Sequence, residues 1–394
     1  MSHCTDCPGS GNAMLTRADL IILGGGCAGL SLAMRLAGWG LDCPRIALIE
    51  RRVDYGHDRT WSYWRTPGGR LTHLAGREWT AVSVTAAGRK VSVDCREMPY
   101  QVIASSDFYA EAWRRIRANP RIDCFLGEEV TTPPMREAGE WRVATARGEW
   151  RGATIIDTRP PTNASAVPPR LWQSFSGVEV ECPDGTFADH EATLMDFEPD
   201  SSGTISFLYL LPYSTGRALV EATVFSPERR SDAEMQPLLA RVLARATAGR
   251  PYQLGRHEHH AIPMGGGGEA SSLGEGHVRM GLHAGAARAA TGYAFQRIQR
   301  WADAAADAAA RGRAIPSIAR DPWIIRRMDS LFLRVLARAP ERAPGLFLRL
   351  FARPDPRPVL RFLSDEARPA DYLKVMRSLP AGLFLREALR GILP

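Results

Sequence analysis

The stretch DLIILGGGCAGLSLAMRLAG, residues 19–38, decides the fold of the first part of the chain. A short apolar run ends in glycines, and apolar residues then recur at helical spacing. A second apolar run, RIALIE (residues 45–50), ends in an acid. This order of strand, glycine turn, helix and strand predicts a βαβ unit of the kind that binds dinucleotides.

The glycines of the GxGxxG pattern have separate expected tasks. Gly24 turns the chain, Gly26 lets backbone N–H groups reach a pyrophosphate, and Gly29 lets helix and strand approach closely. The helix start, which includes Ala28, offers unpaired N–H donors to the phosphates. Glu50 lies about 20 residues beyond the last glycine, where an acid can accept the ribose hydroxyls. We therefore predict all five residues to bind the cofactor.

The bulk composition is that of a folded protein of two or three domains. The chain has 394 residues, 45% of them hydrophobic, and no apolar run of about 18 residues that could cross a bilayer. The first 16 residues lack the basic start and apolar core of a secretory signal, so we expect a cytoplasmic protein. Seven cysteines without a spacing framework favour reduced thiols. Cys4 and Cys7 form a CxxC that no second pair completes, and no metal site is predicted.

The chain is expected to divide into a Rossmann-type domain, a β-rich domain and a helical end. Alternating apolar residues from about residue 71 to residue 93 predict an antiparallel β insertion. Residues 107–120 predict a helix, and residues from 321 onward predict short helices broken by prolines. We predict a disordered tail at 1–16, a discontinuous nucleotide-binding domain at 17–70, 100–165 and 260–312, a β-rich substrate domain at 71–99 and 166–259, and a basic amphipathic helical region at 313–394.

Several longer blocks are more specific than the nucleotide turn. They include TWSYW (residues 60–64), IIDTRPP (155–161), FLYLLPYSTGRALVEATVFS (207–226) and ATGYAFQRIQ (290–299). In content and order the blocks resemble the flavin-containing bacterial lycopene β-cyclases, which are related in fold to the hydroxybenzoate-hydroxylase-like flavoproteins. The resemblance implies an α/β fold with a Rossmann-type FAD-binding domain, a β-rich substrate domain and a C-terminal helical region.

The resemblance also implies an activity and its cofactors. The activity is cyclisation of the acyclic ψ-ends of lycopene, or of a related acyclic carotenoid, to β-rings without net redox change. The cofactor is reduced FAD, with NAD(P)H as electron donor. On the matching blocks, further cofactor-binding residues are expected at Asp157, Gly285, Thr291, Gly292 and Tyr293.

The resemblance of its block indicates Glu221 as the candidate acid/base carboxyl, or as a group that stabilises the cation. Ring closure requires a proton donor in a dry apolar chamber, and the neighbours of Glu221 in RALVEATVF are largely apolar. Desolvation raises the pKa of a carboxyl and keeps a proton available near neutral pH. The alternative is a surface strand residue, or an ion-pair partner of Arg217.

Aromatic rings and a cation complete the predicted chamber. Trp61 is the first candidate for stabilising a carbocation through its ring face. The other aromatic candidates, of which most are expected to be plain core, are Tyr63, Trp64, Phe207, Tyr209, Tyr213 and Tyr293. A long Ala-rich helix is predicted to begin near Gly292, with its amides and Arg288 at the N1–C2=O edge of a flavin. A packing helix with a small-residue start is the alternative.

The C-terminal part of the chain carries most of the excess positive charge. From Asp321 onward there are 14 Lys and Arg against 8 Asp and Glu, six of the seven net charges. Apolar pairs recur beside arginines at helical spacing, which favours an anionic membrane surface over nucleic acid. We therefore predict a location at the inner face of the cell membrane. Helices that only cap the substrate domain are the alternative.

A histidine pair does not change this interpretation. His257 and His259 would share one face of a strand, but no third ligand is visible, so no metal is predicted.

The leading hypothesis for the function is a lycopene β-cyclase. The alternatives are an FAD-dependent monooxygenase or prenyl reductase acting on a lipophilic substrate, and a non-catalytic flavoprotein that binds carotenoid or lipid.

Overall fold

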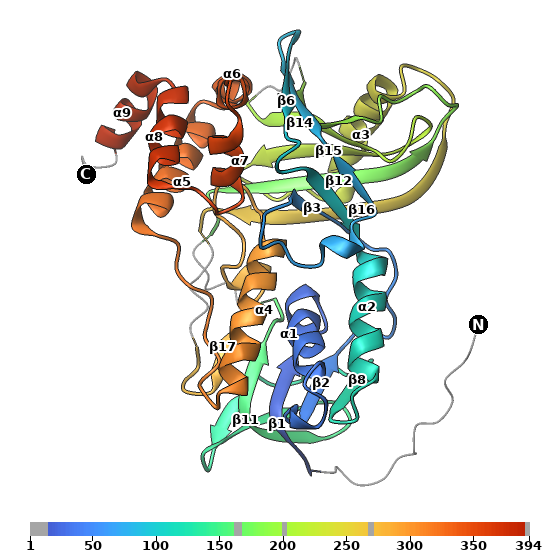
Figure 1. The fold of residues 1–394 in the computed structure, drawn as a ribbon, viewed down its shortest axis with the longest axis vertical. Helices are drawn as coiled ribbons and strands as arrows, with labels where there is room; N and C mark the ends of the chain where they lie inside the picture. Colours follow the sequence, from blue (N-terminus) through green and yellow to red (C-terminus); the bar gives the residue numbers. More distant parts are fainter. Residues whose placement is uncertain (1–14, 161–167, 199–202, 267–271, 391–394) are drawn as a thin grey trace.

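The structure is a computed structural model that describes residues 15–160, 168–198, 203–266 and 272–390. One end of the molecule contains a largely parallel sheet covered by three helices, and the other contains a large, mostly antiparallel sheet flanked by the C-terminal helices (Figure 1). The predicted tail is shorter than expected, because residues 15 and 16 already belong to the first strand. Cys4 and Cys7 lie outside the described residues.

The first sheet is the expected βαβ unit extended on both sides. Its parallel strands lie in the order β8 (Ile122–Leu126), β2 (Ile46–Glu50), β1 (Leu15–Leu23), β11 (Glu149–Asp157) and β17 (His277–Arg279). The first half of β11 also pairs with β10 (Glu140–Ala144), which continues to β9 (Met135–Glu137). Leu23 is in register with Ile49 and Asp157, so the carboxyl ends of three strands meet at one edge.

Alternation along β1 explains how both faces of this sheet are covered. Leu20 and Ile22 pack into a core with the helices α1 (Cys27–Ala37), α2 (Ser105–Arg117) and α4 (Phe295–Ala310). Ile21 and Leu23 point to the other face, against aromatic residues of the β9–β11 region. The three helices pack side by side, with α1 in contact with both others.

The second sheet has one face toward a helix and one toward the interior. Its order is β16 (Gln253–Met264), β12 (Leu171–Glu181), β15 (Arg217–Ser226), β14 (Ile205–Pro212), β13 (Glu191–Phe197), β5 (Ala81–Ala86) and β6 (Arg89–Asp94). Val220, Ala222 and Val224 of β15 pack under α3 (Asp232–Ala246), so the residues between them face the other way. A small sheet of β3 (Thr60–Trp64), β7 (Tyr100–Ala104) and β4 (Arg77–Trp79) lies between the two large ones. Because β16 runs to Met264, residues 260–264 belong to this sheet and not to the nucleotide-binding part.

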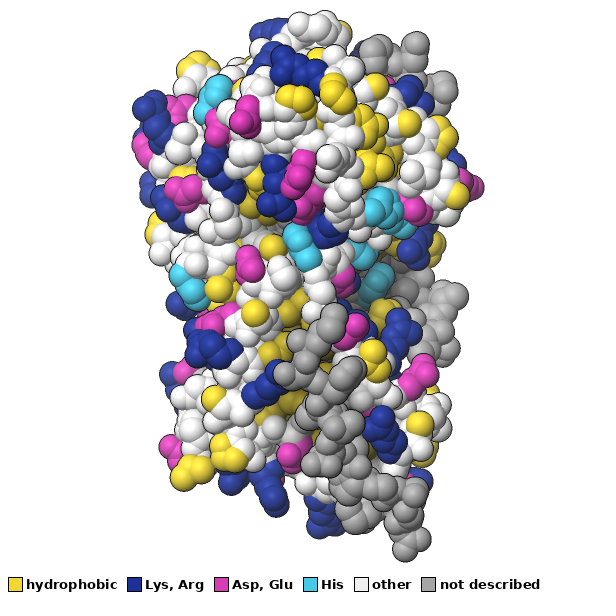
Figure 2. Space-filling view, turned by 90° about the vertical axis from the view of Figure 1, so that its right-hand side faces the viewer, with side chains coloured by type: hydrophobic (Ala, Val, Ile, Leu, Met, Phe, Trp, Pro, Cys, Tyr) yellow, Lys and Arg dark blue, Asp and Glu magenta, His cyan; other side chains and the backbone are white. Residues whose placement is uncertain are grey.

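The C-terminal helices form a group that packs on the second sheet mainly through α6, while α9 packs on α5 and α8 on α7. They are α5 (Trp323–Arg338), α6 (Ala343–Phe351), α7 (Arg357–Leu363), α8 (Pro369–Ser378) and α9 (Ala381–Arg390). Phe347 of α6 lies 5.8 Å from Phe197 and 6.4 Å from Phe225, ring centre to ring centre. None of the helices in the described ranges is both long and apolar enough to cross a bilayer. The face opposite these helices carries acidic and basic side chains interspersed (Figure 2).

Candidate functional site

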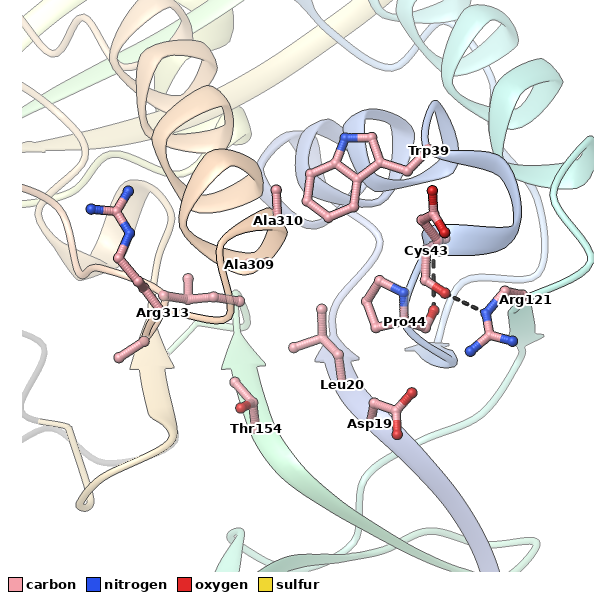
Figure 3. A pocket seen from close by; sticks show the side chains of 13 residues that line it. Asp19, Leu20, Trp39, Cys43, Pro44, Arg121, Thr154, Ala309, Ala310 and Arg313 are labelled. Atoms are coloured by element: carbon pink, nitrogen blue, oxygen red, sulfur yellow. Dashed lines mark hydrogen bonds between the residues drawn. The ribbon is translucent and has the colours of Figure 1, made fainter.

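A cavity of about 570 Å³ connects the nucleotide turn with the second sheet. Its wall includes residues 26–28 at the start of α1, residues 291–298 around the start of α4, and Glu221 on β15. Another cavity, of about 670 Å³, lies at the amino ends of β2 and β8, beside Asp19 of β1 and Thr154 of β11 (Figure 3). Because open α/β sheets bind their ligands beyond the carboxyl ends of the strands, the first cavity is the candidate site.

The glycine turn has the shape that a dinucleotide requires. Gly24 has a φ of +98°, and a Cβ on Gly29 would lie 2.0 Å from the carbonyl oxygen of Gly24. A side chain at position 29 would therefore separate α1 from β1. A Cβ on Gly26 would meet nothing within 4 Å, so space is open at the start of α1, where a phosphate would contact the N–H groups.

Glu50 ends β2 and holds the turn in place. Its Oε2 accepts a hydrogen bond of 2.5 Å from the N–H of Gly25, and its Oε1 accepts one of 2.8 Å from the N–H of Arg52. Arg52 and the Tyr55 hydroxyl donate to the carbonyl oxygen of Gly25, at 3.0 and 2.9 Å. A carboxylate oxygen can accept a second hydrogen bond, so Glu50 can still bind ribose hydroxyls. The sequence does not indicate Arg52 and Tyr55, because no spacing rule connects them to the glycines.

The segment after β11 closes the other side of the turn. The Thr158 hydroxyl donates to the carbonyl oxygens of Leu23 and Gly24, both at 3.0 Å. Asp157 lies at the carboxyl edge as expected, but its carboxylate is engaged by Arg159 through two side-chain bonds of 2.9 Å. Burial would raise the pKa of Asp157, but hydrogen bonds and charge from Arg159 hold it below its usual value. The carboxylate therefore faces an arginine of its own loop.

The cofactor-binding residues predicted between positions 285 and 293 divide into two groups. Thr291, Gly292 and Tyr293 line the cavity. Gly292 has a φ of +70°, and a Cβ there would lie 2.9 Å from Ile262, so this turn needs glycine. Gly285, in contrast, ends a short helical turn at residues 282–284, whose residues 282 and 283 line the cavity in its place. The helix α4 begins at Phe295, three residues after the predicted start.

Arg288 is not directed at the cavity. It is fully buried, and its Nε and Nη2 donate to the two carboxylate oxygens of Asp329 on α5, both at 3.1 Å. A third contact joins Nη1 to the carbonyl oxygen of Phe362, and the guanidinium lies 4.1 Å from the centre of the Phe362 ring. The expectation that Arg288 directs its charge toward a flavin in the cavity is therefore wrong. Arg288 clamps the loop before α4 to the C-terminal helices, because its acidic partners are Asp329 on α5 and, at 3.6 Å, Asp365 after α7.

Glu221 lies on the cavity wall and is 8% exposed. Its Oε1 accepts a hydrogen bond of 2.8 Å from the Thr223 hydroxyl. Burial, followed by the charge of Glu258, raises the pKa of Glu221 to about 8. Arg217, the alternative partner considered above, pairs with Glu179 at 2.6 Å. Glu221 is thus a buried acid that holds a proton at neutral pH.

Glu258 is a second acid on the same cavity wall, and it was not among the predicted site residues. It lies on β16, is 4% exposed and forms an ion pair with Arg256. Strand alternation could have found it, because Glu258 must point away from His257 and His259. Those two histidines approach Asp232 at the start of α3, at 3.3 and 3.6 Å. The described residues contain no group of three or more His, Cys, Asp or Glu side chains that could hold a metal ion.

All of the aromatic candidates except Tyr213 line the cavity, so the expectation that most of them are plain core is wrong. Trp61 lines the cavity and stacks on Phe295 with ring centres 5.1 Å apart, and Tyr63 stacks on the same ring at 5.4 Å. Tyr209 lies beside Glu221 in the sheet register, and its hydroxyl is 3.0 Å from that of Tyr100. The other candidates on the wall are Tyr63, Trp64, Phe207 and Tyr293. Tyr213 is not on the wall and lies under Arg217 instead.

The C-terminal helices close the far end of the cavity. Phe347, Leu350 and Phe351 of α6 and Leu363 of α7 contribute apolar side chains to its wall. This arrangement supports the capping alternative for α6 and α7. The result is an apolar and aromatic chamber with two buried acids on one wall and the nucleotide turn at its other end.

Comparisons with known proteins agree with this architecture. Solved structures with the same fold include a geranylgeranyl bacteriochlorophyll reductase-like protein from Thermoplasma acidophilum, at 12% identity and a TM-score of 0.63, covering 95% of this chain and 99% of that one. A p-nitrophenol 4-monooxygenase from Pseudomonas putida matches at 14% identity and a TM-score of 0.59, covering 95% and 98%. A flavin-dependent brominase matches at 14% identity and a TM-score of 0.60, covering 92% and 98%. These similarities confirm the predicted fold class.

The sequence comparisons give the family. A search of curated proteins finds no match. The family model described as "Lycopene cyclase protein" matches residues 19–388, nearly the whole chain. The chain therefore belongs to the lycopene cyclase family.

Proposed function

We propose that this protein is a flavin-dependent lycopene β-cyclase in which Glu221 is the acid. The observation that carries the proposal is a buried carboxyl of raised pKa on the wall of an aromatic chamber that continues to a dinucleotide turn. A general acid works best when its pKa lies near the operating pH. A pKa of about 8 meets that condition at neutral pH.

The reaction that we propose is an isomerisation. Glu221 delivers a proton to C2 of the terminal alkene, which leaves a tertiary cation at C1. The C5–C6 double bond then attacks C1, and loss of the proton from C6 gives the β-ring. Atoms and electrons balance without an oxidant or reductant. The rings of Trp61 and Tyr209 can stabilise a passing cation without trapping it.

The residues around the glycine turn fit FAD. Backbone N–H groups at the start of α1 would hold the pyrophosphate, Glu50 the ribose, and residues 291–293 the flavin end. A reduced flavin, generated by NAD(P)H, would supply an electron-rich ring that stabilises positive charge. The chain's own part is to exclude water through the apolar wall and to hold the proton at Glu221.

Anaerobic incubation with lycopene, reduced FAD and the purified protein tests the proposal. We expect cyclic products of unchanged mass, and loss of product in Glu221→Gln with flavin content retained. The control is Glu181→Gln, an exposed acid at the end of β12. Addition of oxygen or hydrogen to the product would instead favour a monooxygenase or a prenyl reductase. Bound lycopene without turnover in the unsubstituted protein would favour a binding protein.

We also propose that α8 and α9 bind the membrane surface that supplies the substrate. Leu373, Met376, Leu385 and Leu389 are 42 to 61% exposed, and basic residues such as Arg386 are exposed beside them. Basic amphipathic helices bind anionic interfaces. Leu385→Ser combined with Leu389→Ser should weaken co-sedimentation with anionic vesicles. Leu254→Ser, which changes an exposed leucine of β16, should leave it unchanged. Equal binding by both variants would contradict the assignment.

A further inference from the structure

Glu221 and Glu258 flank a glycine on three adjacent strands. Gly177 of β12 is in register with Glu221 of β15 on one side and with Glu258 of β16 on the other. Residues in register point to the same face of a sheet, so both acids face the cavity. A Cβ on Gly177 would lie 3.3 Å from both Cβ and Cγ of Glu221. The side chain of Glu221 therefore lies over Gly177, toward Glu258. A larger residue at position 177 would be in tight contact with it.

The two acids differ in their partners. Arg256 forms an ion pair with Oε2 of Glu258 and donates to the Thr60 hydroxyl at 2.7 Å and to Glu179 at 3.2 Å. The Thr60 hydroxyl donates to the same Oε2 at 3.3 Å. Glu221 has instead the neutral Thr223 hydroxyl as its hydrogen-bond donor. Burial raises the pKa of Glu258 above its usual value, and the Arg256 guanidinium and the Thr60 hydroxyl oppose that rise. Glu221 makes no ion pair, so Glu258 is the one of the two carboxyls whose charged form is stabilised by a bound cation.

From this arrangement we infer that Glu258 is a second catalytic carboxyl, held as an anion by Arg256, which accepts the proton that the substrate loses while Glu221 donates the proton that it gains. The inference rests on the proposed function and deepens it. It assigns acid and base to different residues of one wall, and makes Arg256 and Thr60 positioning residues for the base.

The proton balance closes within the pair. Glu221 passes its proton to C2 and becomes a carboxylate, and Glu258 takes the proton from C6 and becomes neutral. The proton then returns from Glu258 to Glu221 across Gly177, and the pair again holds one proton. The other titratable groups near the pair include Glu179 on β12, which forms ion pairs with Arg217 and Arg256. They also include Tyr209, Tyr213 and His260. Burial raises the pKa of the two phenols and lowers the pKa of the imidazole, so these three groups remain neutral near pH 7.

Coupling of the two carboxyls can be measured without substrate. The infrared carbonyl band of protonated Glu221, identified by its loss in Glu221→Gln, should titrate near pH 8 in the unsubstituted protein. In Glu258→Gln the midpoint should move to lower pH, because the negative charge that favours the neutral form of Glu221 is gone. Glu181→Gln should leave the midpoint in place. An unmoved midpoint in Glu258→Gln would overturn the inference.

Turnover supplies the second measurement. Removal of a general base typically costs about 10²- to 10⁴-fold in rate, so Glu258→Gln should lower kcat by at least about 10²-fold, with KM and flavin content near those of the unsubstituted protein. Glu258→Asp should recover part of the loss. If the unsubstituted protein cyclises lycopene and Glu258→Gln keeps its kcat, the base assignment falls while the proposed function stands. If the midpoint moves but the unsubstituted protein gives no cyclic product, the proposed function falls and the base role with it.

Discussion

Arg288 gives the sharpest test of the structure against the sequence, because the two assign it different tasks. In the structure it is a buried clamp, with both oxygens of Asp329 and the Phe362 carbonyl as partners. Arg288→Ala would leave the Asp329 carboxylate, only 2% exposed, without its guanidinium. Breaking a buried pair by removing one partner typically costs about 3–5 kcal/mol. That is a large share of the roughly 5–15 kcal/mol that stabilises a typical folded domain.

The assay is equilibrium unfolding in denaturant, with flavin affinity measured on the folded protein. We expect Arg288→Ala to lower the free energy of unfolding by about 3–5 kcal/mol and to leave flavin affinity nearly unchanged. Arg288→Met combined with Asp329→Leu should recover much of the loss, since no unpaired charge then remains. The control is Arg311→Ala, which removes an exposed pair with Asp307 on α4 and should cost less than about 1 kcal/mol.

The opposite pattern would refute this reasoning. If Arg288→Ala keeps its stability to within about 1 kcal/mol, the scale of an exposed pair, and loses flavin affinity, then Arg288 acts on the cofactor. The clamp seen in the structure would then have no energetic importance, and the sequence-based assignment would be restored.

Three further results are expected. Gly29→Ala should abolish flavin binding, read from the absorbance of the purified protein, because its Cβ would collide with the Gly24 carbonyl; Gly76→Ala, where a Cβ meets nothing within 4 Å, should bind flavin normally. Glu221 binds a proton more tightly in the folded than in the unfolded chain, so stability should fall as pH rises from about 4.5 to about 8. Glu221→Gln should flatten that slope in unfolding curves measured across this range, and an unchanged slope would place the carboxyl in solvent. Phe347→Ala should lower the free energy of unfolding, measured by denaturation, by about 3 kcal/mol. This is the lower end for such a change, because one side of the ring faces the cavity. A loss below about 1 kcal/mol would mean that α6 does not seal the chamber.

Much of the nucleotide-binding half was predictable because its signals are local. The glycines, the following helix and Glu50 lie within about 30 residues, and backbone sterics at Gly24 and Gly29 leave few alternatives. Glu221 was selected mainly through the family resemblance of its block, and its apolar neighbours on both sides indicated its burial. The sequence did not show that α6 and α7 line the cavity, because these helices reach it only by packing on a sheet that is distant in the sequence.

The sequence by itself determined the βαβ unit, the burial of Glu221 and the family. Only the tertiary structure decided which charges meet. Arg288 faces α5 because Asp329 lies there, 41 residues further along the chain. Glu258 and Glu221 lie on either side of Gly177 because β12 pairs with both β15 and β16, and the order of these strands in space is not their order in sequence. The physical reason is that desolvation and charge depend on neighbours in space, and strand pairing brings those neighbours from separate parts of the chain.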